Sequence, residues 1–484
     1  MKSEQNPSPK SVIFTILLGA ITVSLNNSAL NPALPEFMQI FHVGPALASW
    51  ILAAFMLAMS LTLPVTGYLS QNLGKRRIYM TGLALFVFGS ILGSMANNIY
   101  LVIMARSLQG IASGLILPLS LAFIFSVTEI QKRGRITSLW ASTVMFSLAI
   151  GPFIGAIILA TSRWEMLFLL NIPIALFTFI LAAKHLTKDQ NSTKSTFDWV
   201  GFSLITCGLG YLIWTCHQIK SWQDLTSSSN FVALGLAFGC LLFFIFHQLK
   251  SKAPLLNLRL FQCRHYSLSV MIVMIQTVAM FECLVLLPLL IQEVFNFNPI
   301  WTGIALLTTA LSASLSLNLA GKVLDLHGPR NIVMLGLVLS AIAMFALGQL
   351  SIQPHNMVVI IVLMTLRGIG IGFSVTPLTT AGLNYIAQPY LVEATAMHDM
   401  VRRTASSIAI VFVAIYLEIR SSSFMQQGLP QLLSLHVSIN EVFLATGGLI
   451  ALTLPCAYFL ASKKQQHFSE FSTEPSLING LDKD

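Results

Sequence analysis

Glu282 is the most unusual ionisable residue of this chain, because it lies inside the long apolar run VAMFECLVLL. Arg106 and Arg367 lie inside two other apolar runs, and Asp399 stands three residues before Arg402. Ionisable side chains are rare in such surroundings, where they mark proton relays or ligand sites. A carboxyl group can take up and release protons there, and a nearby guanidinium changes how tightly it holds them. We therefore predict proton coupling by Glu282, Arg106 and Asp399.

Each of these residues also has a plainer structural interpretation. Glu282 could remain protonated and form a hydrogen bond with a neighbouring helix. The side chain of Arg106 could extend to the outer membrane surface. Asp399 and Arg402 have the spacing of an ion pair within one helix, which would place them at the cytoplasmic mouth of a pathway.

The motifs of soluble enzymes are absent from the sequence. It contains no GxxxxGK[ST] phosphate-binding loop, no HExxH and no GxSxG. The six cysteines form no CxxC pair, so we interpret them as apolar packing residues rather than as metal ligands or disulfides. We therefore predict that the protein is not an enzyme, binds no metal or cofactor, and uses a proton gradient as its energy source.

The composition is that of a membrane protein. Of the 484 residues, 55% are hydrophobic and only 9% are charged, whereas about a quarter are charged in soluble domains. The net charge of +9 falls in short gaps between apolar runs, so nucleic acid is not an expected partner. A membrane-spanning helix needs about 20 apolar residues. Fourteen such runs predict an all-α polytopic fold, at residues 11–33, 47–69, 77–96, 99–124, 136–160, 165–183, 199–218, 230–248, 267–291, 300–321, 331–350, 356–380, 402–420 and 439–461.

The basic residues predict the orientation of the chain. With both termini in the cytoplasm, the inner loops and tails hold twenty of the Lys and Arg residues and the outer loops hold three. Basic residues accumulate in cytoplasmic loops, so this distribution predicts an integral membrane protein with cytoplasmic termini. The first run, 11–33, is too long for a signal peptide and is expected to remain in the mature protein.

A repeat divides the chain into two halves. The loop GYLSQNLGKRR begins at Gly67, and GKVLDLHGPRN begins 254 residues later at Gly321. RSLQGIASGLILPL at Arg106 is echoed by RGIGIGFSVTPL at Arg367. Parallel repeats of this kind are a transporter architecture. We predict an N-terminal six-helix half (1–185), an inserted helix pair (186–262), a C-terminal six-helix half (263–462) and a cytoplasmic tail (463–484).

These motifs resemble the fourteen-helix drug:proton antiporter branch of the major facilitator superfamily. The resemblance also includes LNNSALNPALP in helix 1, SLAIGPFIGA in helix 5 and RWEMLFLLNIP before helix 6. It implies that helices 1, 4, 9 and 12 line a substrate cavity, with candidate residues Asn26, Asn27, Gln109 and Arg367. It also implies conformational roles, in a cytoplasmic latch and a helix-5 bend, for Gly67, Gly74, Arg76, Gly151, Pro152, Gly155, Asp325 and Arg330.

The sequence departs from the family at two positions. Asn26 and Gln71 stand where the family carries acids, and an amide cannot carry a proton. At the repeat offset of 254, Glu282 corresponds to Ser28, close to Asn26. We therefore expect Glu282 to carry the proton in place of the missing helix-1 acid. If Asn26 faces the cavity, Asn26→Asp should change the charge of the preferred substrate.

Together these features predict a secondary active exporter that expels a small amphipathic compound, such as a drug or a metabolite, by proton-coupled antiport. Alternatives are an exporter of an anionic or zwitterionic metabolite such as a siderophore, an uncoupled uniporter or importer, and a non-transporting membrane protein. The expected partners are a small-molecule substrate and membrane lipid. The expected location is a bacterial inner membrane, with the protein acting as a monomer or with a periplasmic adaptor.

Overall fold

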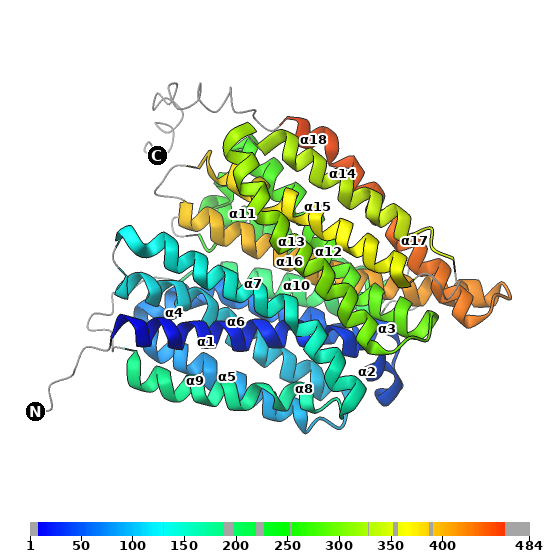
Figure 1. The fold of residues 1–484 in the computed structure, drawn as a ribbon, viewed down its shortest axis with the longest axis horizontal. Helices are drawn as coiled ribbons and strands as arrows, with labels where there is room; N and C mark the ends of the chain where they lie inside the picture. The colour runs from blue at the N-terminus through cyan, green and yellow to red at the C-terminus, as the bar shows by residue number, and fades with distance from the viewer. Residues whose placement is uncertain are drawn as a thin grey trace, which may run out of the picture.

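The computed structural model describes residues 8–128, 130–186, 197–218, 227–251, 254–327, 329–351, 357–386 and 391–459, and every regular element among them is helical (Figure 1). Thirteen helical segments in these ranges are long and apolar enough to cross a membrane. A shorter apolar stretch, Trp199–Leu212, occupies the one remaining predicted run. The all-α polytopic architecture predicted from the sequence is therefore confirmed.

The first half of the chain contains six long helical segments. Its elements are α1 (Pro9–Ala29), η1 (Asn31–Ala33), α2 (Leu34–Phe41), α3 (Pro45–Ala48), α4 (Trp50–Leu73), α5 (Lys75–Ser94), α6 (Ile99–Val127), α7 (Ile130–Thr161), α8 (Met166–Leu169) and α9 (Asn171–His185). A single residue, Gly74, separates α4 from α5. Its φ of 93° lies in the left-handed region that favours glycine, so this tight connection depends on Gly74.

The second half follows an additional pair of helices, α10 (Trp199–Gln218) and α11 (Ser228–Lys250). Its elements are η3 (Leu258–Gln262), α12 (Arg264–Pro288), the π-helical turn η4 (Leu289–Val294), α13 (Pro299–His327), α14 (Pro329–Leu347), α15 (Met357–Leu383), α16 (Leu391–Gln426), α17 (Gln431–Leu452) and α18 (Leu454–Tyr458). In Figure 1 the blue and cyan helices of the first half lie below the green, yellow and orange helices of the second.

Three helices begin at least six residues earlier than their apolar runs predict. α7 begins at Ile130 rather than 136, α16 at Leu391 rather than 402, and α17 at Gln431 rather than 439. The additional turns contain polar residues, which hydropathy excludes from a membrane-spanning run, although they continue the helix. As a result, Asp399 lies inside α16 rather than in the segment before it.

The two halves contact each other along two seams. In the first, Ser60 of α4 forms a 2.7 Å hydrogen bond with Thr404 of α16, and the Ser407 hydroxyl donates to the Ala53 carbonyl at 2.9 Å. In the second, α7 packs against α13, where Gly303 leaves room for the α7 backbone. These seams place α4, α7, α13 and α16 around the space between the halves.

A second set of bonds joins the halves at the end of the bundle that is predicted to face outward. Gln39 Nε2 donates to Glu293 Oε1 at 3.0 Å, and Gln292 Nε2 donates to the Pro32 carbonyl at 3.0 Å. Because η1, α2 and η4 carry these residues, the bonds lie beyond the long helices of the central space. They hold the halves together at this end.

Asp198 fastens the beginning of α10 to the end of α11. Its carboxylate accepts hydrogen bonds from the Gly201 amide at 2.8 Å, from Gln248 Nε2 at 2.7 Å and from the His247 ring at 2.9 Å. Burial raises the pKa of Asp198, but the hydrogen bonds from Gly201, His247 and Gln248 and the charge of His247 outweigh it and hold this pKa below its ordinary value. The inserted pair thus has its own polar connection.

Candidate functional site

A cavity of about 300 Å³ lies between the two halves. α1, α4, α6 and α7 line it from one side, and α12, α13, α15 and α16 from the other. Most of the wall is apolar, with Phe55, Met59, Met280, Phe281 and Met364 among its residues. Such large, adaptable side chains suit apolar ligands of varied shape.

The charged residues of this wall are all arginines. Arg367 comes from α15, and Arg402 and Arg403 come from α16. No Asp or Glu lines the cavity within the part of the chain that the structure describes. The polar residues of the wall are amides and hydroxyls such as Asn27 and Gln276. The cavity wall therefore has a positive character.

Arg106 lies behind the wall, fully buried among neutral acceptors. Its Nη1 donates to Asn26 Oδ1 at 2.6 Å and to Gln109 Oε1 at 2.9 Å, and its Nε donates to the Ile51 carbonyl at 3.2 Å. The guanidinium also stands over the Phe55 ring, 4.2 Å from its centre. Arg106 Nη2 and Asn26 Nδ2 have no hydrogen-bond partner. This arrangement holds a buried cation with amides where an acid would be the ordinary partner.

Of the four residues that were predicted to line the cavity, two lie on its wall and two lie behind it. Asn27 and Arg367 are on its wall, as predicted. Asn26 and Gln109 are fully buried and bind Arg106 instead. Adjacent residues of a helix point about 100° apart, so two neighbouring asparagines can serve different surroundings. The sequence does not tell which of the two faces the cavity.

Glu282 lies on the far side of α12 from the cavity. The α12 residues on the wall are Gln276, Thr277, Met280, Phe281 and Leu284. At about 100° per residue, Glu282 points roughly 160° away from the centre of that face. Its Oε2 accepts a 2.6 Å hydrogen bond from the hydroxyl of Thr446 on α17. Glu282 therefore does not lie on the cavity wall with Asn27, and its predicted role in proton coupling stays a prediction.

Arg367 connects Glu282 with the cavity. It is buried, lines the wall, and donates from Nη2 to the Ala279 carbonyl of α12. Glu282 follows Ala279 by one turn of α12, so the guanidinium bound at Ala279 lies within electrostatic reach of the Glu282 carboxyl group. A change in the charge of Glu282 therefore acts on a side chain that reaches the cavity.

The lining residues correct the register of the repeat. The five on α12 each follow one on α1 or η1 (Val23, Ser24, Asn27, Ser28 and Asn31) by 253 positions, whereas the loops beyond have an offset of 254. The π-helical turn η4 lies between these regions, and a π turn accommodates one extra residue. Glu282 therefore corresponds to Ala29 rather than to Ser28.

The two buried arginines are not equivalent positions either. Gly110 packs against the Phe55 carbonyl and Gly368 against the Thr309 carbonyl, and Phe55 and Thr309 are 254 residues apart. These contacts pair Gly110 with Gly368, which makes Arg367 the counterpart of Gln109. Arg367 thus lies one helical turn further along its helix than Arg106 does.

Asp399 pairs with Arg402 as its spacing predicts. Arg402 Nη2 lies 3.0 Å from Asp399 Oδ1, one turn along α16. The neighbouring Arg403 reaches the sulfur of Met59 on α4, with Nη1 3.4 Å from Sδ. Arg402 and Arg403 were not predicted as cavity residues. The sequence feature that could have identified them is a pair of consecutive arginines at the start of a predicted apolar run.

The helix-5 glycines bring α7 against α1. A Cβ atom at Gly151 would overlap the Ser28 hydroxyl, and one at Gly155 would overlap the Ala29 carbonyl oxygen. Pro152, between them, faces the cavity. Close approach of two helices needs small residues at the contact. The predicted gating role of these three residues stays a prediction, but their contact with α1 is established.

The basic loops make their contacts within their own halves. Arg76 donates to the Ala183 carbonyl at the end of α9, and the Arg330 guanidinium stands 3.4 Å from the centre of the Tyr458 ring. Among the described residues, no atom lies within 4 Å of the position that a Cβ of Gly67 would occupy. The side chains of Gln71 and Asp325 and the tail after residue 462 lie outside the described part of the structure. A latch between the halves remains a prediction.

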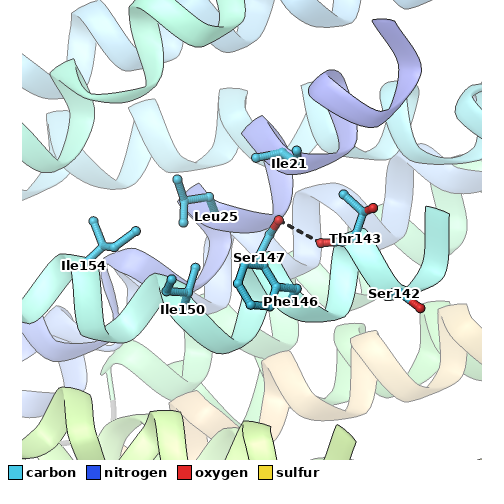
Figure 2. Close-up of a pocket in the computed structure, with 8 residues that line it drawn as sticks. All are labelled: Ile21, Leu25, Ser142, Thr143, Phe146, Ser147, Ile150 and Ile154. Atoms are coloured by element: carbon cyan, nitrogen blue, oxygen red, sulfur yellow. Dashed lines mark hydrogen bonds between the residues drawn. The ribbon is translucent and has the colours of Figure 1, made fainter. Parts of the chain in front are cut away.

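A second hollow, of about 430 Å³, lies between α1 and α7 (Figure 2). Ile21, Leu25, Ile150 and Ile154 make its wall apolar, and Phe146 at its edge is 62% exposed. Two hydroxyls in this hollow donate within α7, Thr143 to the Leu139 carbonyl and Ser147 to the Thr143 carbonyl, each at 2.8 Å. The hollow lies on the opposite face of α7 from Val144, Leu148 and Pro152, which line the central cavity. We assign it to the lipid-facing surface.

Comparisons with known proteins agree with this architecture. Residues 16–410 match the sequence model of the Major Facilitator Superfamily. An uncharacterized MFS-type transporter of Bacillus subtilis, YcnB, is 29% identical over 84% of this chain and 86% of its own length. The lincomycin resistance protein LmrB of Listeria innocua is 24% identical over 95% of this chain and 98% of its own. The multidrug export protein EmrB of Haemophilus influenzae is 25% identical over 82% of this chain and 78% of its own length.

Solved structures share the fold at lower sequence identity. A D-xylose-proton symporter superposes with a TM-score of 0.64 at 15% identity, covering 94% of this chain and 99% of that chain. The inward-open xylose transporter XylE of E. coli gives a TM-score of 0.60 at 15% identity, covering 94% and 97%. These likenesses establish the arrangement of the helices.

Proposed function

Because the chain belongs to the Major Facilitator Superfamily, we propose that it is a secondary active exporter that expels small amphipathic compounds in exchange for protons. Two of its relatives are named as a multidrug export protein and a lincomycin resistance protein, which supports export of such compounds. The single observation that carries proton coupling is the buried Glu282 beside Arg367, which reaches the cavity.

Exchange in this fold would proceed by rocking of the two halves around the cavity. The bonds of Gln39 and Gln292 hold the halves together at the predicted outer end, while the cavity wall extends along α16 to Arg402 and Arg403 near its predicted inner end. These features support an arrangement that is open to the cytoplasm. The close contact of Gly151 and Gly155 with α1 would let α1 and α7 move as one unit.

Glu282 would act on the cavity through Arg367. When Glu282 is deprotonated, its carboxylate balances the charge of Arg367. When it is protonated, that balance is removed and Arg367 presents its full charge to the cavity. The proton and the substrate therefore need not occupy the same place. Thr446 holds the carboxyl group in position in both states, because a carboxyl oxygen can accept its hydrogen bond with or without the proton.

Three further features belong to the proposal. The protein would lie in a bacterial inner membrane with both termini in the cytoplasm, as its basic loops indicate. It would need no cofactor, since the proton gradient supplies the energy. It would work as a monomer or deliver its substrate to a periplasmic adaptor.

Proton coupling can be tested with Glu282→Gln in proteoliposomes. A pH-sensitive dye inside the vesicles reports proton movement when a transported compound is added. The wild type should show a substrate-dependent proton flux, and the variant should lose it while still binding the compound. Glu165→Gln is the matched control, because Glu165 lies outside the cavity wall and pairs with Arg163 at 2.8 Å within the first half. An unchanged flux in Glu282→Gln would rule out Glu282 as the coupling residue.

A second candidate is export driven by the membrane potential without protons. The positive cavity wall and the amides Asn26 and Gln71 in place of family acids favour it, because an inside-negative potential drives anions outward. In this case wild-type vesicles would accumulate the substrate in response to a potassium diffusion potential, with no proton flux.

A further inference from the structure

Arg403 has N–H donors in the central cavity that lack a strong hydrogen-bond acceptor. It is largely buried on α16 and lines the wall beside Met59. Its Nη1 faces the Met59 sulfur at 3.4 Å, and its buried Nε has no hydrogen-bond partner among the residues that the structure describes. A thioether is a weak acceptor, whereas a guanidinium offers five N–H donors. A buried guanidinium in this condition lacks the acceptor that its geometry demands.

The positive charge of Arg403 is also the least balanced of the three on the wall. Arg402 is paired with Asp399 at 3.0 Å, and Arg367 lies beside Glu282. Asp399 is near Arg403 as well, but one carboxylate cannot neutralise two guanidinium groups. Since no Asp or Glu lines the cavity among the residues that the structure describes, a net positive charge remains at Arg403.

We propose that Arg403 binds a negatively charged group of the substrate, so that the exporter transports amphipathic anions. The guanidinium fork fits a carboxylate through two parallel N–H···O bonds. The ligand's oxygen atoms would replace the Met59 sulfur and satisfy Nε, while its apolar body would lie against Met280 and Phe281. This inference rests on the proposed function in one respect, namely that the central cavity is the substrate path.

The anion site and the proton site would be separate. Arg403 stands on α16 against α4, whereas Glu282 stands on α12 against α17. A bound anion would thus leave the pairing of Arg367 and Glu282 in place. Substrate charge selection and proton coupling can therefore fail independently, and separate measurements can tell them apart.

The test uses three probes with the same apolar body: naphthylbutanoate, its neutral amide and the corresponding trimethylammonium compound. Their binding to the full-length protein is measured in nanodiscs of zwitterionic lipid, without a proton gradient. The carboxylate should bind at least about tenfold more tightly than the amide, since a hydrogen-bonded charged group contributes about 1.5–3 kcal/mol, which is roughly a 10- to 100-fold change in affinity. Arg403→Gln should remove this advantage and change amide binding by less than about twofold.

Two further variants make the result specific. Arg420→Gln is the matched control, because Arg420 binds Glu441 at 2.8 Å outside the cavity wall, and it should leave all three affinities unchanged. Asp399→Asn should release Arg402 from its ion pair and increase the affinity for the carboxylate. Arg403→Lys should keep part of the preference, because it retains the charge but not the fork.

Several outcomes would overturn the inference. These are an absence of saturable carboxylate binding, a preference for the trimethylammonium probe, and an equal loss of carboxylate and amide binding in Arg403→Gln. Glu282→Gln should keep the preference for the carboxylate. Failure of proton coupling with an intact anion preference would therefore refute only the proposed exchange mechanism.

Discussion

Replacing Asn26 with Asp would test the Arg106 network directly. The substitution is nearly isosteric, and it places a carboxylate where Asn26 Oδ1 now accepts a 2.6 Å bond from Arg106. It also converts the unpartnered Asn26 Nδ2 donor into an acceptor next to a guanidinium whose Nη2 has no partner. The variant should therefore stabilise the folded protein.

The size of the effect follows from opposing contributions. Opposite charges with centres about 4 Å apart attract by about 4 kcal/mol at an effective dielectric constant of about 20. Burying the new carboxylate costs several kcal/mol. Each unpartnered buried donor of the wild type costs about 1–3 kcal/mol, and the variant removes at least one. We expect a net stabilisation of about 2 kcal/mol.

Thermal unfolding of the purified protein in one detergent measures this gain. An unfolding entropy of about 2.1 cal/mol/K per residue makes 1 kcal/mol equal to about 1 °C in a chain of 484 residues, so the midpoint should rise by about 2 °C. Asn27→Asp is the matched control, since Asn27 faces the cavity and has no such partner. It should leave stability nearly unchanged and weaken anion binding, whereas Asn26→Asp should not alter substrate charge preference. A lower midpoint for Asn26→Asp, or an equal rise for Asn27→Asp, would refute the reasoning.

Two further predictions concern the helix contacts, in addition to the Glu282 and Arg403 variants above. Gly155→Ala should abolish transport and destabilise the protein by about 1–3 kcal/mol, because the new methyl group overlaps the Ala29 carbonyl oxygen. Gly448→Ala, which has open space around it, is the control and should be tolerated. Transport assays and thermal unfolding compare the two variants, and a fully active Gly155→Ala would contradict the packing argument. Asp198→Ala should speed amide exchange at the start of α10 by about fivefold, equivalent to ~1 kcal/mol for a lost cap. Since the folded-state pKa of Asp198 is lowered, its contribution to the stability of α10 should be complete above about pH 4 and be lost as the pH falls through that pKa. Amide exchange of the wild type, corrected for intrinsic rates, should therefore be faster at pH 3 than at pH 6. Equal protection at both pH values would contradict this.

Hydropathy alone predicted where the chain crosses the membrane, because lipid imposes a strong constraint on every spanning helix. It could not predict which face of α12 meets the cavity. That helix is apolar on all sides, so no periodicity distinguishes the cavity face from the face that packs on α17. Glu282 was recognised as a buried carboxyl group, but the sequence did not show that its side chain points away from the cavity and toward α17.

The repeat allowed the two halves to be aligned, but the alignment of α1 with α12 was off by one residue and that of α6 with α15 by about one turn. The register depends on the π-helical turn η4, which leaves no sign in an apolar sequence. It also depends on the glycine contacts of α6 and α15, which need the three-dimensional neighbours. For this reason the pairing of Glu282 with Ser28, and that of Arg367 with Arg106, required correction.

The bond between Gln39 and Glu293 has a consequence for the history of the chain. These residues are 254 positions apart, which is the offset of the loops that follow η4, and Glu293 lies at the end of η4, so we pair them as equivalent places in the two halves. Residues that meet their own equivalents lie on the axis that relates the halves. In a dimer of two identical half-length chains, this position would face a copy of itself, and a glutamate there would meet a second glutamate. Joining the halves in one chain allowed the two copies to diverge into a donor and an acceptor, which two identical subunits could not have done.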